Sequence, residues 1–378
     1  MVKEILKNLV EIDTTNTIGN ESKACDYLEK VFEGKAKKIE RIGKFPRENL
    51  IAYFGNLESK KVLVITGHLD VAPYNREKWD TNPFTAVELD GKIFGRGTCD
   101  MKGGLAIGIE AILQVVEQNL LEDKMLIFAG TADEEIGACS EIGAKIVAKY
   151  LKEKDINPVG VILPEPNNDY EILKVNIGHR GMMALQCESN GKAMHPGSTV
   201  VLENNAVNNM YEFITEVNKV IPRNPTNENG IPGSSCRVTY INAGLENAFK
   251  SVPDNCVCNL DVRISPLESN ENVLNIINKI VEEKNVKINC LRKTNSSIIE
   301  KDEKIVAELI KILDEEKQKY EICCASPVCD AHWFNELGMP TINTFGASGG
   351  NVHAHNEYAM LDTLDGRVDL LVKLIEKI

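Results

Sequence analysis

Three short, nearly unbroken apolar runs constrain the fold of this chain more than any other feature. They span residues 61–70 (KVLVITGHLD), 125–131 (MLIFAGT) and 159–163, and stretches with helical periodicity at 104–121 and 141–154 lie between them. A strand covered by helices on both faces of a parallel sheet has such a run, because neither of its faces meets water. Strands that alternate with helices therefore predict an α/β fold with a doubly wound, mostly parallel sheet.

The pattern changes near Arg180. Strand-like segments and two long amphipathic helices, near 204–220 and 270–283, follow in the order β-α-β-β-α-β, which is typical of a ferredoxin-like unit. The first pattern then resumes and ends in a helix over 364–378. The expected domains are a catalytic domain formed by 1–179 and 293–378, and an inserted α+β lid domain over 180–292.

The net charge and the length of the chain limit the kinds of partner that it is expected to bind. The 378 residues fit two domains, and the formal net charge is −13 without any cluster of Lys and Arg. Nucleic acids and anionic membrane surfaces both favour positive charge, so neither is an expected partner. A small-molecule substrate is expected instead.

The N-terminal segment and the cysteines indicate a cytoplasmic protein. Residues 1–16 place apolar side chains at helical spacing with charges between them, which predicts an amphipathic helix and not a signal peptide. No apolar run approaches the length that spans a bilayer. The eleven cysteines are scattered, as expected where thiols stay reduced. Cys256 and Cys258 alternate with Val257 in a strand-like stretch, so we expect them to be buried packing residues and not metal ligands.

The polar residues of interest follow predicted strands, where open α/β sheets place their ligand sites. His68 and Asp70 in GHLD lie two residues apart on one face, so Asp70 can hydrogen-bond the free ring nitrogen of a metal-bound His68. Asp100 lies in GRGTCDMKGG, whose glycines let the backbone bend before the next helix. A carboxylate so placed can bridge two cations, and the loop does not match the GxxxxGK[ST] phosphate motif.

Three further carboxylates follow strands. Glu134 and Glu135 in ADEEIG are adjacent, so in extended chain they point in opposite directions and suit two different tasks. One can bind metal while the other moves a proton of the attacking water. Glu165 in LPEP stands between two prolines, which stiffen its backbone as a fixed ligand requires.

A pair of histidines near the C-terminus completes the set. His353 and His355 in SGGNVHAHNEY can share a face, but a hydrolytic centre needs open coordination positions, so only one of them is expected to bind metal. The mixed nitrogen and oxygen donors fit two zinc ions and, less well, cobalt or manganese. Two such ions can polarise a carbonyl and activate water, so the residues predict a metal-dependent hydrolase.

These residues resemble those of a known metallopeptidase family, which includes acetylornithine deacetylase, succinyl-diaminopimelate desuccinylase, aminoacylase and glutamate carboxypeptidase. The resemblance covers nearly the whole chain, and five motifs match in order and spacing. They are GHLDVAP at 67–73, GRGTCDMKGG at 95–104, ADEEIG at 132–137, PEP at 164–166, and His353 followed four residues later by Glu357.

The resemblance implies a role for each matched residue. Glu134 would be the general base, and the distance to Glu357 favours His353 over His355 as the ligand. His195 in GKAMHPGS would stabilise the oxyanion, often across a homodimer formed by the small domain. The implied ligand sets are His68, Asp100 and Glu165 for one ion, and His353, Asp100 and Glu135 for the other. The implied substrate-binding residues are Arg263, with Arg180, Gly349 and Gly350 as weaker candidates.

The motifs leave the substrate open. Removal of an acetyl or succinyl group from the amine of a small amino-acid derivative competes with dipeptidase or carboxypeptidase activity. Met101 and Lys102 after Asp100 resemble the deacetylase and desuccinylase branch. A non-catalytic metal-binding or ligand-binding module would not require Glu134, and a dinucleotide-binding enzyme would need a GxGxxG turn after its first strand, which is missing.

Overall fold

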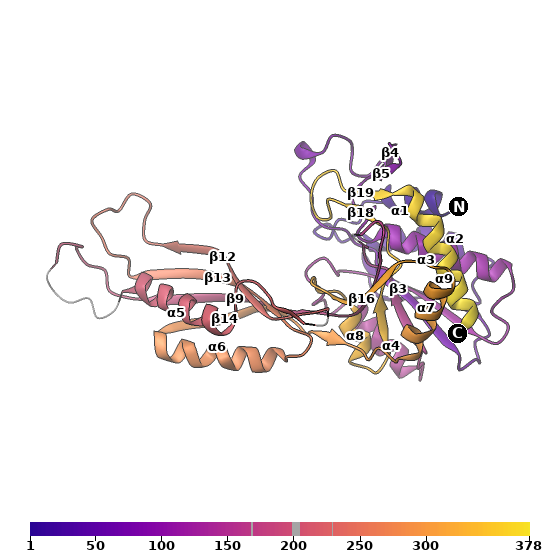
Figure 1. Ribbon diagram of the computed structural model, residues 1–378. Coiled ribbons are helices and arrows are strands. Elements are labelled where there is room, and N and C mark those ends of the chain that lie inside the picture. The colour runs from indigo at the N-terminus through magenta and orange to yellow at the C-terminus, as the bar shows by residue number, and fades with distance from the viewer. Residues whose placement is uncertain (168, 199–204, 229) are drawn as a thin grey trace. The chain divides into compact units, whose positions relative to one another are not determined.

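The chain forms two compact units, seen in the computed structural model, which describes residues 1–167, 169–198, 205–228 and 230–378 (Figure 1). The larger unit comprises Met1–Gly178, Ile298–Cys323 and Cys329–Ile378, and the smaller comprises His179–Ser297 and Cys324–Val328. The short second piece belongs to the smaller unit because the backbone N–H of Arg180 donates to the carbonyl of Ala325 at 3.1 Å.

A nine-stranded sheet organises the larger unit. Its order is β1-β2-β6-β3-β7-β17-β8-β15, with β16 paired to β8, and β3 runs parallel to both β6 and β7. The apolar runs of the sequence form these central strands, so the predicted α/β fold with a mostly parallel sheet is confirmed. The strands are β1 (Lys38–Lys44), β2 (Arg47–Gly55), β3 (Val62–His68), β6 (Met125–Thr131), β7 (Gly160–Leu163), β8 (Leu173–His179), β15 (Ser297–Ile298), β16 (Tyr320–Ala325) and β17 (Thr341–Asn343).

Helices cover both faces of this sheet (Figure 1). Val62 and Val64 pack into a core cluster with residues of α4 and α8, whereas Ile65, which points to the other face, lies against Gly108 of α3. The predicted amphipathic N-terminal helix is α1. The helices are α1 (Val2–Val10), α2 (Glu21–Phe32), α3 (Lys102–Glu117), α4 (Ala144–Glu153), α7 (Lys304–Glu315), α8 (Ala331–Asn335) and α9 (Leu364–Lys377), with the 3-10 turns η1 (Arg76–Lys78) and η2 (Leu361–Thr363).

A second, small antiparallel sheet in the larger unit was not apparent from the sequence. Its order is β18-β19-β5-β4, formed by β4 (Val87–Leu89), β5 (Lys92–Phe94), β18 (Gly349–Gly350) and β19 (Tyr358–Met360). It pairs the strand that leads into the loop of Asp100 with the strand that follows His353. Two segments far apart in the sequence are thereby brought together.

Glycines at the start of α3 bring this helix close to the segment that follows β7. A Cβ atom at Gly104 would lie 1.8 Å from the carbonyl oxygen of Pro164, and one at Gly103 would lie 2.3 Å from that of Thr98. Neither position has room for a side chain. The glycines of GRGTCDMKGG therefore allow Asp100 and Glu165 to approach each other.

The smaller unit is an antiparallel sheet of order β12-β13-β9-β14 with two helices (Figure 1). The elements follow the chain order β9-α5-β12-β13-α6-β14, so the predicted β-α-β-β-α-β pattern is confirmed. Cys256 and Cys258 are free and buried in its core, as expected. Its elements are β9 (Gly181–Asn190), α5 (Ala206–Val220), β12 (Ser235–Ala243), β13 (Asn255–Ile264), α6 (Asn270–Lys284) and β14 (Val286–Thr294), with the short hairpin of β10 (Asn227–Glu228) and β11 (Ile231–Pro232).

Among the described residues, no helix combines the length and the apolar character that crossing a membrane requires.

Candidate metal centre

Three parallel strands end at the same edge of the large sheet, and a polar segment follows each. His68 is the last residue of β3 and lies opposite Thr131, the last residue of β6. Glu134 and Glu135 follow β6, and Glu165 follows β7. Because parallel strands share their direction, these side chains gather at the carboxyl edge of the sheet.

His68 is buried and faces two carboxylates. Its Nε2 lies 3.2 Å from Oδ1 of Asp100 and 3.9 Å from Oε2 of Glu165. Its Nδ1 donates to the backbone carbonyl of Asp70 at 2.9 Å, while the Asp70 carboxylate is 3.7 Å away. The spacing of the two residues predicts this bond for the Asp70 carboxylate, whereas the structure shows it at the Asp70 backbone carbonyl. The carbonyl nevertheless fixes the ring so that Nε2 faces the cluster.

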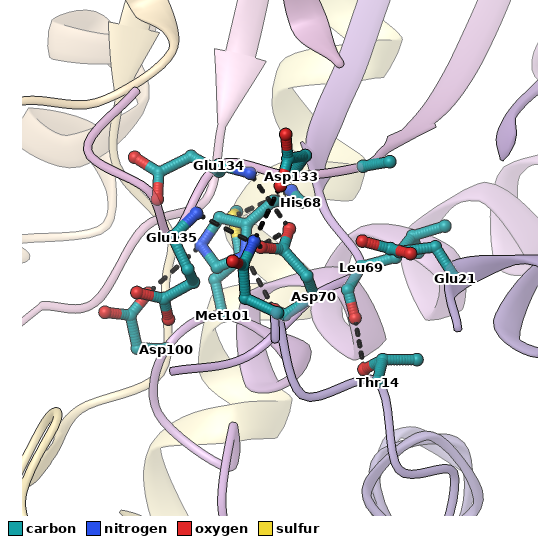
Figure 2. A network of polar contacts seen from close by, with 12 residues as sticks. Thr14, Glu21, His68, Leu69, Asp70, Asp100, Met101, Asp133, Glu134 and Glu135 are labelled. Atoms are coloured by element: carbon teal, nitrogen blue, oxygen red, sulfur yellow. Dashed lines mark hydrogen bonds and ion pairs between the residues drawn. The ribbon is translucent and has the colours of Figure 1, made fainter. Parts of the chain in front are cut away.

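The Asp70 carboxylate instead positions the two adjacent glutamates (Figure 2). It accepts hydrogen bonds from the backbone N–H groups of Glu134 and Glu135, both at 3.1 Å, and from Nδ2 of Asn16 at 2.8 Å. The carboxylate is fully buried, so these donors replace the water it has lost. Asp70 is therefore a positioning residue for the segment that carries Glu134.

Asp100 and Glu135 meet His353. Nε2 of His353 lies 3.2 Å from Oδ2 of Asp100 and 2.9 Å from Oε2 of Glu135. Asp100 thus contacts His68 with one oxygen and His353 with the other. His353 has a positive φ of 61°, a strained conformation for a non-glycine residue. His355 makes no such contact among the described residues, although both histidines line a neighbouring cavity.

The pKa values of this cluster reflect how closely its charged groups lie to one another. Burial and neighbouring carboxylates raise the pKa of Glu134 and Glu165 well above the usual range, although His68 opposes the shift. The pKa of Asp100 is low because hydrogen bonds to His353 and His68 outweigh its burial. Hydrogen bonds to Asp100 and Glu135 raise the pKa of His353 to about 10.

No Lys or Arg of the described residues pairs with the carboxylates of this cluster, so a metal ion fits the donor set. Three of these residues each offer one ligand atom at close range: a ring nitrogen of His68 and carboxylate oxygens of Asp100 and Glu135 lie within 4.8 Å of one another. Oε1 of Glu135 is buried and has no hydrogen-bond partner among the described residues. A buried carboxylate oxygen without a donor is costly unless a cation satisfies it.

The buried side chain of Glu357 holds the Asp100 loop in place, a role that the sequence did not indicate. Glu357 accepts hydrogen bonds from the backbone N–H groups of Gly97, Cys99 and Asp100 at 3.1, 2.9 and 2.9 Å, and pairs with Arg96 at 2.6 Å. The spacing from His353 had marked Glu357 only as part of a motif. Its actual contacts bridge segments that are about 260 residues apart, which no local pattern can predict.

Gly349 and Gly350 form strand β18 beside β19. A Cβ at Gly349 would lie 2.0 Å from the carbonyl oxygen of Tyr358, and one at Gly350 would lie 2.8 Å from its hydroxyl. Packing against the backbone of β19 is therefore sufficient to require Gly349, whereas Gly350 approaches only the end of the Tyr358 side chain.

The remaining predicted residues belong to the smaller unit and have local partners. Arg263 pairs with Asp261, with Nε 2.7 Å from Oδ1. Arg180 donates to the hydroxyl of Ser235 at 3.1 Å, and burial together with neighbouring arginines lowers its pKa. Nδ1 of the exposed His195 accepts the backbone N–H of Gly197 at 3.1 Å, so Nε2 is the ring nitrogen that can donate.

Together, the doubly wound sheet and the carboxylates and histidines at its edge define the class of metal-dependent hydrolases. The family model for Peptidase family M20/M25/M40 matches residues 64–377, and the chain belongs to this family. The expected family and its class, hydrolases of amide bonds, are thereby confirmed.

Relatives and solved structures extend over most of the chain. A protein of Staphylococcus aureus strain Mu50 named "Probable succinyl-diaminopimelate desuccinylase" is 28% identical over 361 residues, with 82% of this chain and 86% of that protein covered. The M20 family metallo-carboxypeptidase Sso-CP2 of Sulfolobus solfataricus has a similar fold, with a TM-score of 0.80, 18% identity, and 98% and 97% of the two chains covered. A dinuclear metal-binding M20 peptidase of Bacillus subtilis aligns with a TM-score of 0.67 and 13% identity, covering 100% of this chain and 97% of the other.

Proposed function

We propose that this chain removes a succinyl or acetyl group from the amine of a small amino-acid derivative. The observation that carries the proposal is a set of four carboxylates, buried or nearly so, beside the buried His68 and the more exposed His353, with no compensating Lys or Arg among the described residues. Such a set requires cations, and a hydrolase uses them at the carbonyl of its substrate. The relative named as a desuccinylase favours an acyl amino acid over a peptide.

The donor set suits two zinc ions, with cobalt or manganese as substitutes. We assign His68, Asp100 and Glu165 to one ion and His353, Asp100 and Glu135 to the other, with Asp100 shared. The dinuclear peptidase of similar fold supports a count of two. When bound, such ions act as Lewis acids toward the substrate carbonyl and the attacking water.

Glu134 is the general base of this proposal. Burial raises the pKa of its carboxyl well above the usual range, and a carboxylate with a raised pKa accepts a proton more readily than an ordinary glutamate. Hydrogen bonds from its own N–H and that of Glu135 to Asp70 hold the segment in place. Glu134 takes a proton from the attacking water and passes it to the leaving amine.

Residues of the smaller unit contact the substrate in this proposal. Nε2 of His195 donates to the developing oxyanion, since Nδ1 is occupied by Gly197. Arg263 binds a substrate carboxylate, and two hydrogen bonds from Nε and Nη2 to Asp261 fix its guanidinium. Arg180, and Gly349 and Gly350 of the larger unit, are the further candidates for binding the substrate carboxylate.

A substrate panel tests the proposal. The zinc-loaded and cobalt-loaded chain would be assayed with N-succinyl and N-acetyl amino acids, including succinyl-diaminopimelate and acetylornithine, and with dipeptides. We expect the highest kcat/KM with an N-acyl amino acid. A preference for dipeptides or C-terminal residues would support instead the alternative that the carboxypeptidase of similar fold suggests. Inactivity on the whole panel with metals bound would support a binding module.

The smaller unit also suits a homodimer of this cytoplasmic enzyme. Tyr240 and Ile241 on the edge strand β12, and Tyr211 and Val220 on α5, are exposed apolar side chains. Exposed apolar side chains of one unit are typical of an interface between copies. Sedimentation of the full chain tests this assembly, which predicts twice the mass of 41.9 kDa.

A further inference from the structure

A polar cavity in the larger unit shares no lining residue with the metal centre. Its volume is about 320 Å³, at the lower end of the range of small-molecule sites, which is roughly 300 to 1,000 Å³. It lies along the first turns of α9, where Thr363, Gly366 and Arg367 line it, and Tyr170 and Gln318 complete its wall. A Cβ at Gly366 would meet no atom within 4 Å, so the helix leaves open space there.

Arg367 is the unusual residue of this cavity. It is only 5% exposed, yet its guanidinium has no hydrogen bond or ion pair with any residue that the structure describes. Burial lowers its pKa to about 10, and the nearby charge of Asp169 opposes that shift. A guanidinium carries five donors, and those of Arg367 that reach the cavity need acceptors there. An oxyanion in the cavity would supply them.

The other charges of the cavity are mostly neutralised or acidic. Lys373 pairs with Glu316 at 2.6 Å, and the Tyr170 hydroxyl donates to Asp362. Asp362 and Asp369 are exposed carboxylates of the same lining. The cavity therefore combines one unpaired buried cation with carboxylates, and this combination disfavours a multiply charged anion such as phosphate.

We propose that this cavity binds a free α-amino acid in its zwitterionic form. The carboxylate of the ligand accepts two parallel hydrogen bonds from the Arg367 guanidinium, the geometry in which arginine binds carboxylates best. The ammonium group lies beside Asp362 and Asp369. This site is separate from the catalytic one and does not depend on the proposed reaction.

Calorimetric titration of the metal-loaded full chain with L-lysine, acetate and inorganic phosphate tests the proposal. We expect one equivalent of L-lysine to bind to a site that Arg367→Met weakens at least tenfold, while kcat/KM stays unchanged. Acetate should bind this site more weakly, because it lacks the ammonium. Lys377→Met, which removes an exposed charge from the same helix outside the cavity, should leave binding intact.

Gly366→Trp provides a second variant, since it fills the cavity and keeps Arg367. It should abolish the same equivalent of L-lysine without a change in kcat/KM. Binding that survives both Arg367→Met and Gly366→Trp overturns the assignment, as does the absence of this equivalent in the wild-type chain. Phosphate binding that exceeds L-lysine binding at this site overturns the zwitterion in favour of a simple anion site.

Discussion

Two groups of carboxylates lie in the larger unit, and they are neutralised in different ways. Figure 2 shows Asp100, Glu134 and Glu135 of one group, and Glu21 and Asp133 of the other. The metal-site cluster, Asp100, Glu134, Glu135 and Glu165, has two histidines as partners and no Lys or Arg among the residues that the structure describes. The Arg47 cluster, Glu21 and Asp133, is closed by Arg47, which pairs with both carboxylates and donates to the backbone carbonyl of Asn16.

Asp70 connects the two clusters. One of its oxygens accepts Nδ2 of Asn16, whose amide also donates to Asp133 at 2.9 Å, and both oxygens accept N–H groups of the glutamate segment. The chain thus supplies its own cation where the carboxylates serve structure. No described Lys or Arg lies beside the carboxylates of the metal-site cluster, which we propose act in the reaction. The difference identifies the functional cluster better than the count of acidic residues does.

The largest effect should come from Glu134→Gln. The amide keeps the shape of the side chain but cannot take a proton, so kcat should fall by roughly 10²- to 10⁴-fold. Metal analysis should show unchanged metal content, because Glu134 is not an assigned ligand. Glu141→Gln, at an exposed position a few residues later, is the control and should keep its activity. Near wild-type kcat in the metal-loaded Glu134→Gln chain would contradict the proposed base.

Arg47→Met should test the other cluster. Removal of the guanidinium leaves Glu21 and Asp133 without their cation, which should lower the free energy of unfolding by about 3 kcal/mol in urea denaturation. Arg41→Met is the matched control. Arg41 also has several carboxylate partners, but Asp26 and Glu29 are largely exposed, so the loss should be at most about 1 kcal/mol. Equal losses of unfolding free energy in the two variants would mean that burial of the carboxylates around Arg47 has no effect on stability.

Metal binding should raise the free energy of unfolding through the metal-site cluster and not through the Arg47 cluster. Zinc at a hundred times its Kd should raise the free energy of unfolding by about 2.7 kcal/mol per site, and a chelator should reverse the gain. Differential scanning calorimetry with and without chelator measures it. Asp100→Asn should lose most of the gain, while Arg47→Met should retain it. A gain that is independent of Asp100 would place the ions elsewhere.

Much of the metal-site cluster could be predicted from sequence because its residues follow buried strands. The runs that end at His68 and Thr131 specify strands of the same sheet, so the polar residues after them had to meet at one edge. The two histidines near the C-terminus could not be ranked from residue types alone. The contacts of His353 with Asp100 and Glu135 distinguish it from His355.

The supporting contacts could not be predicted because they join distant segments. Neither the pairing of Arg96 with Glu357 nor that of Arg47 with Asp133 leaves a periodic signal in the sequence. The Asp70 carboxylate was misassigned for a related reason. Spacing placed it beside His68, but buried N–H groups at the start of the next segment offered it better donors.

The smallest predicted effect is a pH dependence in the Arg47 cluster. Burial, with the nearby charge of Asp70, raises the pKa of Glu21 from 4.5 to about 7. The folded chain therefore holds a proton that the unfolded chain releases between these pH values. The free energy of unfolding should fall as pH rises from 4.5 to 7, and the penalty should be complete above 7.

Glu21→Gln isolates this contribution because glutamine is neutral at every pH. Relative to the wild-type chain, the variant should gain on the order of 2 kcal/mol between pH 5 and pH 8, measured by urea denaturation at each pH. Glu33→Gln, at the exposed end of the same helix, is the control for the substitution itself. A flat difference for Glu21→Gln would mean that Arg47 neutralises Glu21 completely. The Arg47 cluster would then be fully compensated by its own cation, and the contrast with the metal-site cluster would be sharper still.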